Sequence, residues 1–352
     1  MIVIFMLILI PVSLVLKYLL HAPAPWVFFS GLLALAPLAE WIRRSTEQLA
    51  LHVGPAVGSL LNVTLGNIPE LVLALFILRS GSSHVAKAQI TGSLLGNSLF
   101  GLGIAILAGS FLQAQLKFDR NRAGLLSSLL FLAVMALMIP ALFDYTERSL
   151  IHTQNLTVVE ERLSLSVSVV LLLVYVANLV YTLYTHRDIF SAGTQDPPTW
   201  SIWTAMGALV ASTLFVALES ELISGALEAS ARQFGISPFF IGIILLALVG
   251  NIAEYFAAVY FARQNRMNVA MSITVGSTIQ VALLIAPLLV ILSYLLGTPM
   301  NLVFNNPLEL VAIAGVCFAV AFISRDGETN WFEGVLLLAI YTLLAIAFFF
   351  LG

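Results

Sequence analysis

The sequence predicts an all-α polytopic membrane protein with about eleven transmembrane helices, built as one extra helix and two inverted five-helix repeats. Three observations lead to this fold class. Of the 352 residues, 60% are hydrophobic and only 9% are charged, whereas a soluble domain carries about 25% charged residues. The apolar residues form runs of the length that a helix needs to cross a bilayer. One segment with a distinctive polar pattern also returns later in the chain.

Eleven apolar runs are expected to cross the membrane as helices. The first run could instead be a signal peptide, but it lacks a basic start and its one charge, Lys17, lies near the wrong end. Turn-forming segments separate the runs, and none of them is long enough for a separate soluble domain. The expected spans are residues 2–20, 26–51, 55–79, 85–112, 123–143, 163–185, 200–232, 236–262, 268–296, 308–324 and 331–351.

An internal repeat organises these spans. The segment LGNIPELVLALFILR at 65–79 returns as VGNIAEYFAAVYFAR at 249–263, and the two glutamates are 184 positions apart (254 − 70). Shared helix composition would produce chance matches of Leu and Ala, but not of Asn, Glu and Gly-Ser in one register. We therefore expect an extra helix at 1–20, a first repeat at 24–186 and a second at 200–352. Each repeat holds five spans, an odd number, so the second starts from the opposite membrane face.

Glu70 and Glu254 occupy equivalent positions in the two repeats, deep inside apolar runs. A carboxylate in the bilayer is costly unless it is neutralised, paired or wetted. A structural ion pair is the alternative, but no lysine or arginine lies between residues 49 and 77 or between 233 and 262. The compensating charge is therefore expected to come from solution, as protons or a cation. Inverted-repeat transporters place such sites near the midplane, where the repeats meet.

Other polar residues surround each glutamate in the sequence. Gly-Asn precedes both, and Pro69 removes a backbone donor, so we expect the helix to break and to free carbonyl oxygens. An all-oxygen and amide ligand set suits calcium and disfavours zinc or copper. For the serines and amides taken singly, hydrogen bonds between helices are an equally good explanation. The predicted metal ligands are Glu70, Glu254, Asn67, Asn251, Ser93, Ser277, Gln280 and Asn97, and the two glutamates are also the predicted proton-binding groups.

Five further glutamates lie on spans 26–51 and 200–232. One interpretation is an acidic path on each side of the membrane through which ions enter. The alternative is interfacial carboxylates that pair with Arg43, Arg44 or Arg232. The five residues are Glu40, Glu47, Glu219, Glu221 and Glu228.

At these residues the chain resembles the calcium/proton exchangers of the calcium/cation antiporter superfamily. GNIPEL, extended by ITGSLLGNSLFGLG, is similar to the first family signature, and GNIAEYFAAV followed by RMNVAMSITVGSTIQVALLIAP is similar to the second. The resemblance implies that Glu70 and Glu254 hold calcium and that access alternates between the membrane sides. Three positions depart from the family pattern. Tyr255 stands where the family often has His, Asn268 stands where it often has Asp, and Lys87 stands where many members have Gln.

The predicted function is secondary active exchange of Ca²⁺ for H⁺ by alternating access, with the same two glutamates binding either ion. An empty, doubly ionised site is costly, so the helices should not switch sides unloaded. A sodium/calcium exchanger of the same fold is the first alternative, but the acid expected on span 4 or 9 is missing between residues 71 and 116 and between 255 and 308. A cation channel is the second, although two inverted halves with one acid each suit alternating access better.

The remaining expectations concern partners and location. The net charge of −3 offers no basic surface for nucleic acid. Exchange needs no covalent chemistry, so we expect no enzyme activity and no cofactor, with Ca²⁺, protons and the lipid bilayer as the partners. A small excess of Lys and Arg in alternate loops places the N-terminus in the cytoplasm. The compact size favours a prokaryotic plasma membrane, with an organelle membrane as the alternative.

Overall fold

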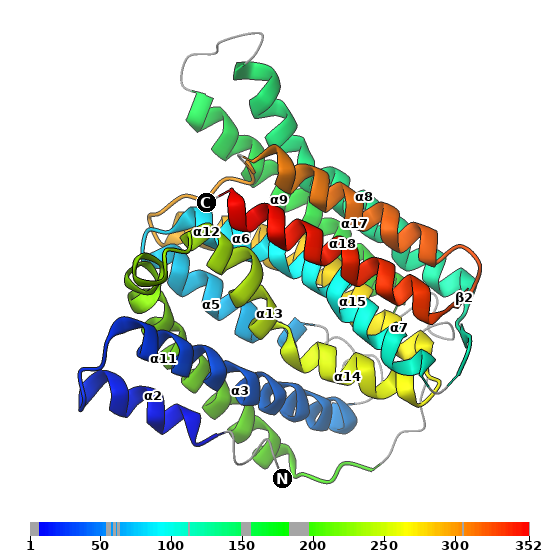
Figure 1. Ribbon diagram of the computed structural model, residues 1–352, viewed down its shortest axis with the longest axis horizontal. Helices are drawn as coiled ribbons and strands as arrows, with labels where there is room; N and C mark the ends of the chain where they lie inside the picture. Colours follow the sequence, from blue (N-terminus) through cyan, green and yellow to red (C-terminus); the bar gives the residue numbers. More distant parts are fainter. Residues whose placement is uncertain are drawn as a thin grey trace. The chain divides into compact units, whose positions relative to one another are not determined.

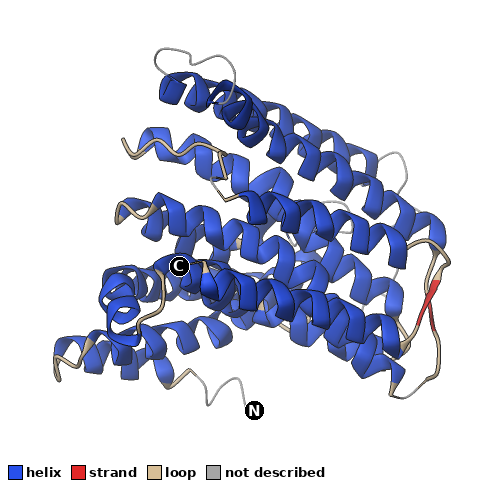
Figure 2. Cartoon of the chain, turned by 45° about the horizontal axis from the view of Figure 1, so that its top comes forward, coloured by secondary structure: helices blue, strands red, loops and turns tan. Residues whose placement is uncertain are grey.

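The computed structural model describes residues 7–53, 58, 61, 64–111, 113–148, 156–182, 197–304 and 306–351. Figure 2 shows that the described chain is almost entirely helical, with one small pair of strands. The strands β1 (Leu116–Lys117) and β2 (Glu328–Thr329) are antiparallel, with Leu116 opposite Thr329. The elements of the first half are α2 Leu9–Tyr18, α3 Ala24–Val53, α5 Ile68–Arg79, α6 Ser83–Leu95, the π-helical turn η1 Gly96–Gly101, α7 Leu102–Ser110, α8 Arg120–Thr146 and α9 Leu156–Val180.

The second half contains two further π-helical turns. Its elements are α11 Ile202–Phe234, α12 Pro238–Phe240, η4 Ile241–Leu246, α13 Ala247–Gly250, α14 Ile252–Arg263, α15 Met267–Gln280, η5 Val281–Ile285, α16 Ala286–Leu295, α17 Pro307–Ile323 and α18 Trp331–Phe350. Side-chain caps fix where several helices begin. Asp119, Ser201, Asn306 and Asn330 each accept a backbone N–H from the first turn of α8, α11, α17 and α18. Helix α11 ends at Gly235, whose φ of 64° is the left-handed conformation that glycine adopts without strain.

Within the described residues, seven helical stretches are long and apolar enough to cross a membrane, or eight if a bent pair is counted as one span. They coincide with eight of the predicted spans, and the shorter helices α2 and α17 coincide with the predicted spans 2–20 and 308–324. Helix α5 forms the second part of the predicted span 55–79, whose first part includes residues outside the described ones. A multi-pass, all-helical membrane protein is therefore confirmed, while the count of eleven and the repeat boundaries remain predictions.

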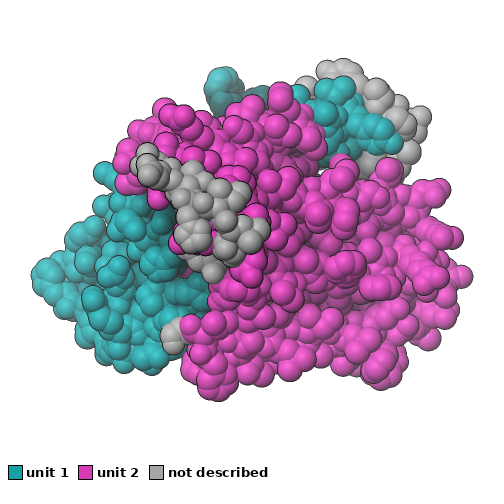
Figure 3. All heavy atoms as spheres, turned by 90° about the horizontal axis from the view of Figure 1, so that it is seen from above, with its two compact units in different colours: residues 1–86, 176–241, 249–253 teal, residues 87–175, 242–248, 254–352 magenta. Residues whose placement is uncertain are grey.

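The chain forms two compact units, coloured separately in Figure 3. The first consists of residues 1–86, 176–241 and 249–253. Its centre is the pairing of α3 with α11, against which α2 and α5 also pack (Figure 1). Phe28, Leu32 and Leu35 are buried on α3 at helical spacing, and Val216 and Ile223 are buried on α11. These apolar stripes hold the two long helices side by side.

The second unit consists of residues 87–175, 242–248 and 254–352. Helix α7 packs on α18, α15 packs on α8 and η1, and α17 packs on α8. Small residues allow the closest approach between α7 and α18. A Cβ added to Gly103 would lie 3.1 Å from the carbonyl oxygen of Gly334, and a Cβ added to Gly334 would lie 3.0 Å from the carbonyl oxygen of Gly103. Membrane helices use such glycines because dispersion contacts between backbones replace the hydrophobic effect as the driving force.

Two glycines that match in the internal repeat have different surroundings in this unit. A Cβ added to Gly92 would overlap the carbonyl oxygen of Ile243 and lie 2.7 Å from the Cβ of Ala247. Among the described residues, nothing lies within 4 Å of a Cβ added to Gly276. The two positions therefore differ in the packing that they permit.

We expect Gly92→Ala to destabilise the protein and Gly276→Ala to leave it nearly unchanged. Overpacking of a close contact costs about 1–3 kcal/mol, because backbone must shift to admit the methyl group. The measurement is the thermal unfolding midpoint of each purified variant in detergent, beside the parent. Equal midpoints for the two variants would contradict the close approach at Gly92.

Candidate ion-binding site

Both signature glutamates lie in the first turn of a helix that follows a break. Helix α5 begins at Ile68, directly after Asn67, and Glu70 lies in its first turn. In the second repeat α13 ends at Gly250, α14 begins at Ile252, and the two helices are bent by 52°. The helix break that the Gly-Asn pairs predict is thus confirmed. Such a break exposes the last carbonyls of one helix and the first N–H groups of the next, and the carbonyls can serve a cation.

In the first unit the structure brings together Glu70 and Asn251, which belong to different repeats. The side-chain amide of Asn251 donates to Glu70 Oε1 over 2.5 Å. Glu70 is 4% exposed and Asn251 is fully buried. A Cβ added to Gly250 would lie 3.4 Å from Glu70 Cγ, so the backbone of the break lies directly against this side chain. An amide N–H that points at a carboxylate stabilises its ionised form.

In the second unit π-helical turns adjoin the predicted ligands. Asn97 is part of η1 and is fully buried, and η5 begins directly after Gln280. Ser93 and Ser277 are also buried, on α6 and α15. π-Helical turns are rare and are found frequently at functional sites, because they leave the helix ladder irregular.

A hydroxyl pair missed by the sequence reasoning connects two of these elements. Ser98 Oγ and Thr278 Oγ1 are 2.7 Å apart, and both residues are fully buried. Ser98 belongs to η1 and Thr278 to α15, so this hydrogen bond joins the segments that carry Asn97 and Ser277. The only sequence signal was the position of each residue next to a predicted ligand.

Tyr255, one residue after Glu254, packs against η1. A Cβ added to Gly96 would lie 2.5 Å from the Tyr255 hydroxyl, and one added to Gly101 would lie 2.6 Å from its ring. The ring also meets Phe100 edge to face, with centroids 5.4 Å apart. The two glycines therefore make the space that Tyr255 fills, and this packing fixes the first turn of α14, which carries Glu254.

The other predicted acidic residues divide into three kinds. Glu40 pairs with Arg43 over 2.8 Å and with Arg44 over 2.6 Å, and Glu47 pairs with Arg43 over 2.5 Å, all within α3. This is the arrangement that the alternative interpretation describes. Glu219 is fully buried, whereas Glu221 and Glu228 are exposed. The paths for entering ions therefore remain a prediction.

A polar network around Lys87 was not predicted as part of any site. Its ammonium group donates to Asn301 Oδ1 over 3.0 Å and to the carbonyl of Val303 over 2.8 Å. The amide of Asn301 then donates to Glu160 Oε2 over 3.1 Å. One turn after Lys87, Thr91 donates to Glu309 over 3.1 Å. Lysine inside an apolar span was the available signal, but its partners lie more than 200 residues away.

This network extends to the end of α8. Arg148 Nε lies 2.6 Å from Asp144 Oδ1, and Arg148 Nη2 lies 3.6 Å from Glu160 Oε1. The hydrogen bond with Asp144 raises the pKa of the Arg148 guanidinium above its usual value. Asp144 and Glu160 are 8% and 4% exposed, so a cation at each end of the network compensates buried carboxylates.

Known proteins match almost the whole chain. A family model described as sodium/calcium exchanger protein matches residues 23–184 and 204–350. A Ca²⁺/H⁺ antiporter of Aphanothece halophytica is 39% identical, over 98% of this chain and 95% of that protein. The Ca²⁺/H⁺ antiporter ChaA of Bacillus subtilis is 38% identical, over 97% of each. The solved structure of native YfkE superposes with a TM-score of 0.85 at 35% identity, over 99% of this chain and 100% of that one.

Replacing Lys87 by methionine should destabilise the protein. The change removes the Lys87 donor from the Val303 carbonyl, whereas Asn301 Oδ1 keeps the backbone N–H of Val303 at 3.3 Å. An unsatisfied buried polar group costs about 1–3 kcal/mol. Lys117→Met, at an exposed position, controls for the loss of one lysine. Thermal unfolding in detergent measures both, and an unchanged midpoint for Lys87→Met would show that the network contributes no stability.

Proposed function

This chain belongs to the sodium/calcium exchanger protein family, and we propose that it exchanges Ca²⁺ for H⁺ across a membrane by alternating access. The curated relatives named Ca²⁺/H⁺ antiporter span almost the full chain. The observation that carries the proposal is the buried carboxylate of Glu70 at a helix break, with its repeat-equivalent Glu254 at a second break. These are two acids without a nearby lysine or arginine in the sequence, each placed in the first turn after a helix break.

In this proposal Glu70 and Glu254 bind either Ca²⁺ or protons. Calcium takes six to eight oxygen ligands at about 2.3–2.6 Å. The two carboxylates, the backbone carbonyls at the break beside Gly250, and a set of hydroxyl and amide oxygens supply chemistry of that kind. The hydroxyl and amide oxygens belong to Ser93, Ser277, Asn67, Asn97 and Gln280. The Asn251 amide that donates to Glu70 stabilises the ionised carboxylate, which is the form that binds the cation.

Coupling follows from the cost of an uncompensated charge. When Ca²⁺ leaves, the carboxylates must take up protons, because an ionised pair without a cation is costly in a low dielectric. The protein can then change access only when loaded with one ion or the other. Proton movement in one direction is thereby tied to calcium movement in the other. We place the N-terminus in the cytoplasm and the chain in a prokaryotic plasma membrane.

A sodium/calcium exchanger is the second candidate, because the description of the matching family names sodium. Sodium would need additional oxygen ligands, and the sequence has no Asp or Glu between residues 71 and 116 or between 255 and 308. A sodium gradient that drives calcium flux at fixed pH would support this candidate over proton exchange.

In proteoliposomes with an acidic interior, the outward proton gradient should drive calcium uptake. A protonophore should abolish the uptake, because it removes the gradient. Glu70→Gln and Glu254→Gln should each abolish it too, because the amide can neither release a proton nor supply charge to the cation. The measurement is uptake of radioactive calcium by the purified, reconstituted protein.

Glu328→Gln provides the matched control for these two variants. It makes the same chemical change at an exposed position in β2, outside the proposed site. It should exchange at the parent rate. Normal exchange by both Glu70→Gln and Glu254→Gln would refute the assignment.

Asn251→Leu should weaken calcium binding while leaving the fold intact. It keeps the number of side-chain heavy atoms but removes the amide that donates to Glu70. A hydrogen bond to a charged group is worth about 1.5–3 kcal/mol, so the apparent calcium affinity should fall roughly tenfold or more. Asn268→Leu, which removes a 2.7 Å hydrogen bond to the Asp119 backbone outside the site, is the control. An equal KM for calcium in both variants would argue against a role of Asn251 in the site.

A further inference from the structure

Glu219 is a fully buried acid that the proposed exchange mechanism does not use. It lies near the middle of α11 and is enclosed by α2 and α3 in the first unit. The hydroxyl of Ser13, on α2, lies 2.6 Å from Glu219 Oε1. A Cβ added to Gly31, on α3, would lie 3.1 Å from Glu219 Oε2, so this glycine leaves room for the carboxyl group. Residues from three helices therefore surround one acid.

Counting hydrogens assigns the protonation state of this acid. Ser13 Oγ also lies 2.8 Å from the carbonyl oxygen of Ile10. A hydroxyl has one hydrogen, and both a carbonyl and an ionised carboxylate only accept. If Glu219 were ionised, the two short contacts of Ser13 would have to share one hydrogen. If Glu219 is protonated, its O–H donates to Ser13 and Ser13 donates to Ile10, so both contacts are hydrogen bonds.

The surroundings of Glu219 also favour the neutral acid. No hydrogen-bond partner for the buried Glu219 Oε2 occurs among the described residues. Burying an ionised carboxylate without a cation among membrane helices is costly. The geometry therefore fits a carboxylic acid.

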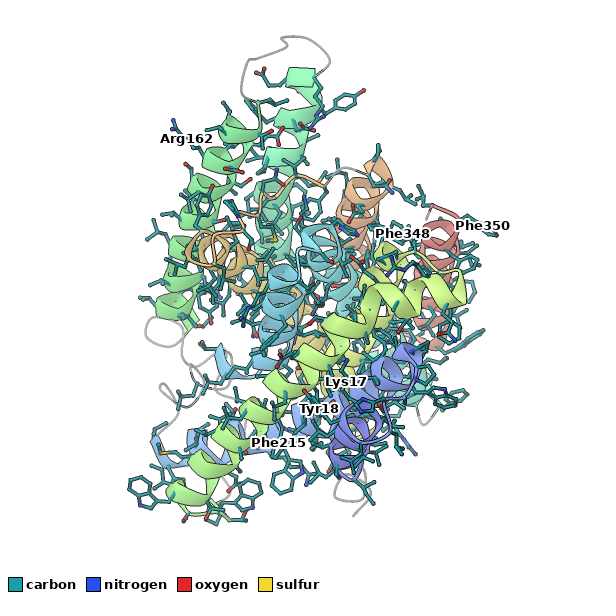
Figure 4. The ribbon with its side chains drawn as sticks, turned by 90° about the vertical axis from the view of Figure 1, so that its left-hand side faces the viewer. Lys17, Tyr18, Arg162, Phe215, Phe348 and Phe350 are labelled. Carbon is teal, nitrogen blue, oxygen red and sulfur yellow. The ribbon has the colours of Figure 1, made fainter. Side chains whose placement is uncertain are left out.

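The charged groups on the same three helices lie elsewhere. On α2, Lys17 is exposed one turn after Ser13, and Figure 4 labels it beside Tyr18 at one end of the helix. On α3, the acids Glu40 and Glu47 pair with the arginines of their own helix. On α11, Glu221 and Glu228 are exposed and Arg232 lies in the last turn.

Helix α2 is only partly packed against its neighbours. A groove of about 460 Å³ lies between α2, α3 and α11, and its apolar lining includes Pro11, Leu38 and Phe215. Phe215, labelled in Figure 4, is one turn before Glu219 on α11. The contact between Ser13 and Glu219 is thus a polar link between α2 and α11, beside an open apolar groove.

We propose that Glu219 is a third proton-binding site, separate from Glu70 and Glu254. Its bound proton keeps α2 packed against α11. When Glu219 releases the proton to solvent, Ser13 must turn its hydrogen from Ile10 to the carboxylate, and a negative charge remains beside the apolar groove. The single hydrogen bond from Ser13 offsets this charge only in part. The buried charge therefore favours separation of α2 from α11, so that water can reach it. This proposal does not depend on which ions the protein exchanges.

Infrared spectroscopy of the reconstituted full chain tests the bound proton directly. The carbonyl stretch of a protonated carboxylic acid should be present at neutral pH and should be lost at alkaline pH. In the double variant Glu70→Gln, Glu254→Gln, which lacks the two acids that the proposed exchange protonates, the band should persist. In the triple variant that adds Glu219→Gln it should be missing, and Glu219→Gln alone should lose one component of it. Identical spectra for the parent and Glu219→Gln across the pH range would overturn the proposal, whatever the transport assay shows.

Hydrogen–deuterium exchange of the α2 amides tests whether the bound proton keeps α2 packed against α11. In the parent, exchange should become faster once Glu219 ionises, whereas Glu219→Gln, which keeps a neutral side chain of the same size, should remain protected at every pH. Glu221→Gln, an exposed acid two residues further along α11, should behave like the parent. Equal pH dependence in the parent and Glu219→Gln would overturn the link to α2.

Ser13→Ala keeps the proposal testable if Glu219→Gln does not fold. This variant retains the acid but removes its partner on α2. The carbonyl band of the protonated acid should then shift in frequency, and the α2 amides should exchange faster at neutral pH. A band and an exchange rate both equal to those of the parent would overturn the proposal.

Discussion

The cost of an uncompensated charge among membrane helices is the constraint from which the rest of this structure follows. Apolar side chains can cover lipid-facing helices everywhere, but each acid inside the chain needs a compensating partner. Two kinds of compensation occur among the described residues: an arginine one turn further along the chain, and a hydroxyl group. Glu40 has arginines one turn away, Asp144 has Arg148, and Glu219 has only a hydroxyl group. The kind of partner decides whether an acid is structural, protonated or available to an ion.

The sequence predicted the features that depend on neighbours in the chain. The breaks before Glu70 and Glu254 follow from Gly-Asn and, in the first repeat, from Pro69, and the structure confirms them. The apolar runs predicted the helices, because the length of a span is a local property. The predicted ligands Asn97 and Gln280 lie in or beside π-helical turns. No local sequence pattern predicted these turns.

Contacts between distant segments could not be predicted in this way. Ser13 and Glu219 are 206 positions apart, and Lys87 and Asn301 are 214 apart. Each side chain alone is compatible with many partners, and only the packing of helices selects one. Tyr255 illustrates the same limit: its fit depends on two glycines of η1 that the sequence shows without indicating what fills the space beside them.

The sequence repeat gives the chain matched positions with unequal surroundings, and in the proposed alternating access this inequality has a use. Gly92 meets a backbone carbonyl directly, while a methyl group on Gly276 would meet nothing among the described residues. In the exchange that we propose, inverted halves with identical packing would make the two membrane sides equivalent, and a change of access would exchange their packing. Acids held by arginines on their own helix keep their partner through such a change, because that helix carries both. An acid compensated by an ion from solution is the kind that can exchange its partner between the two conformers.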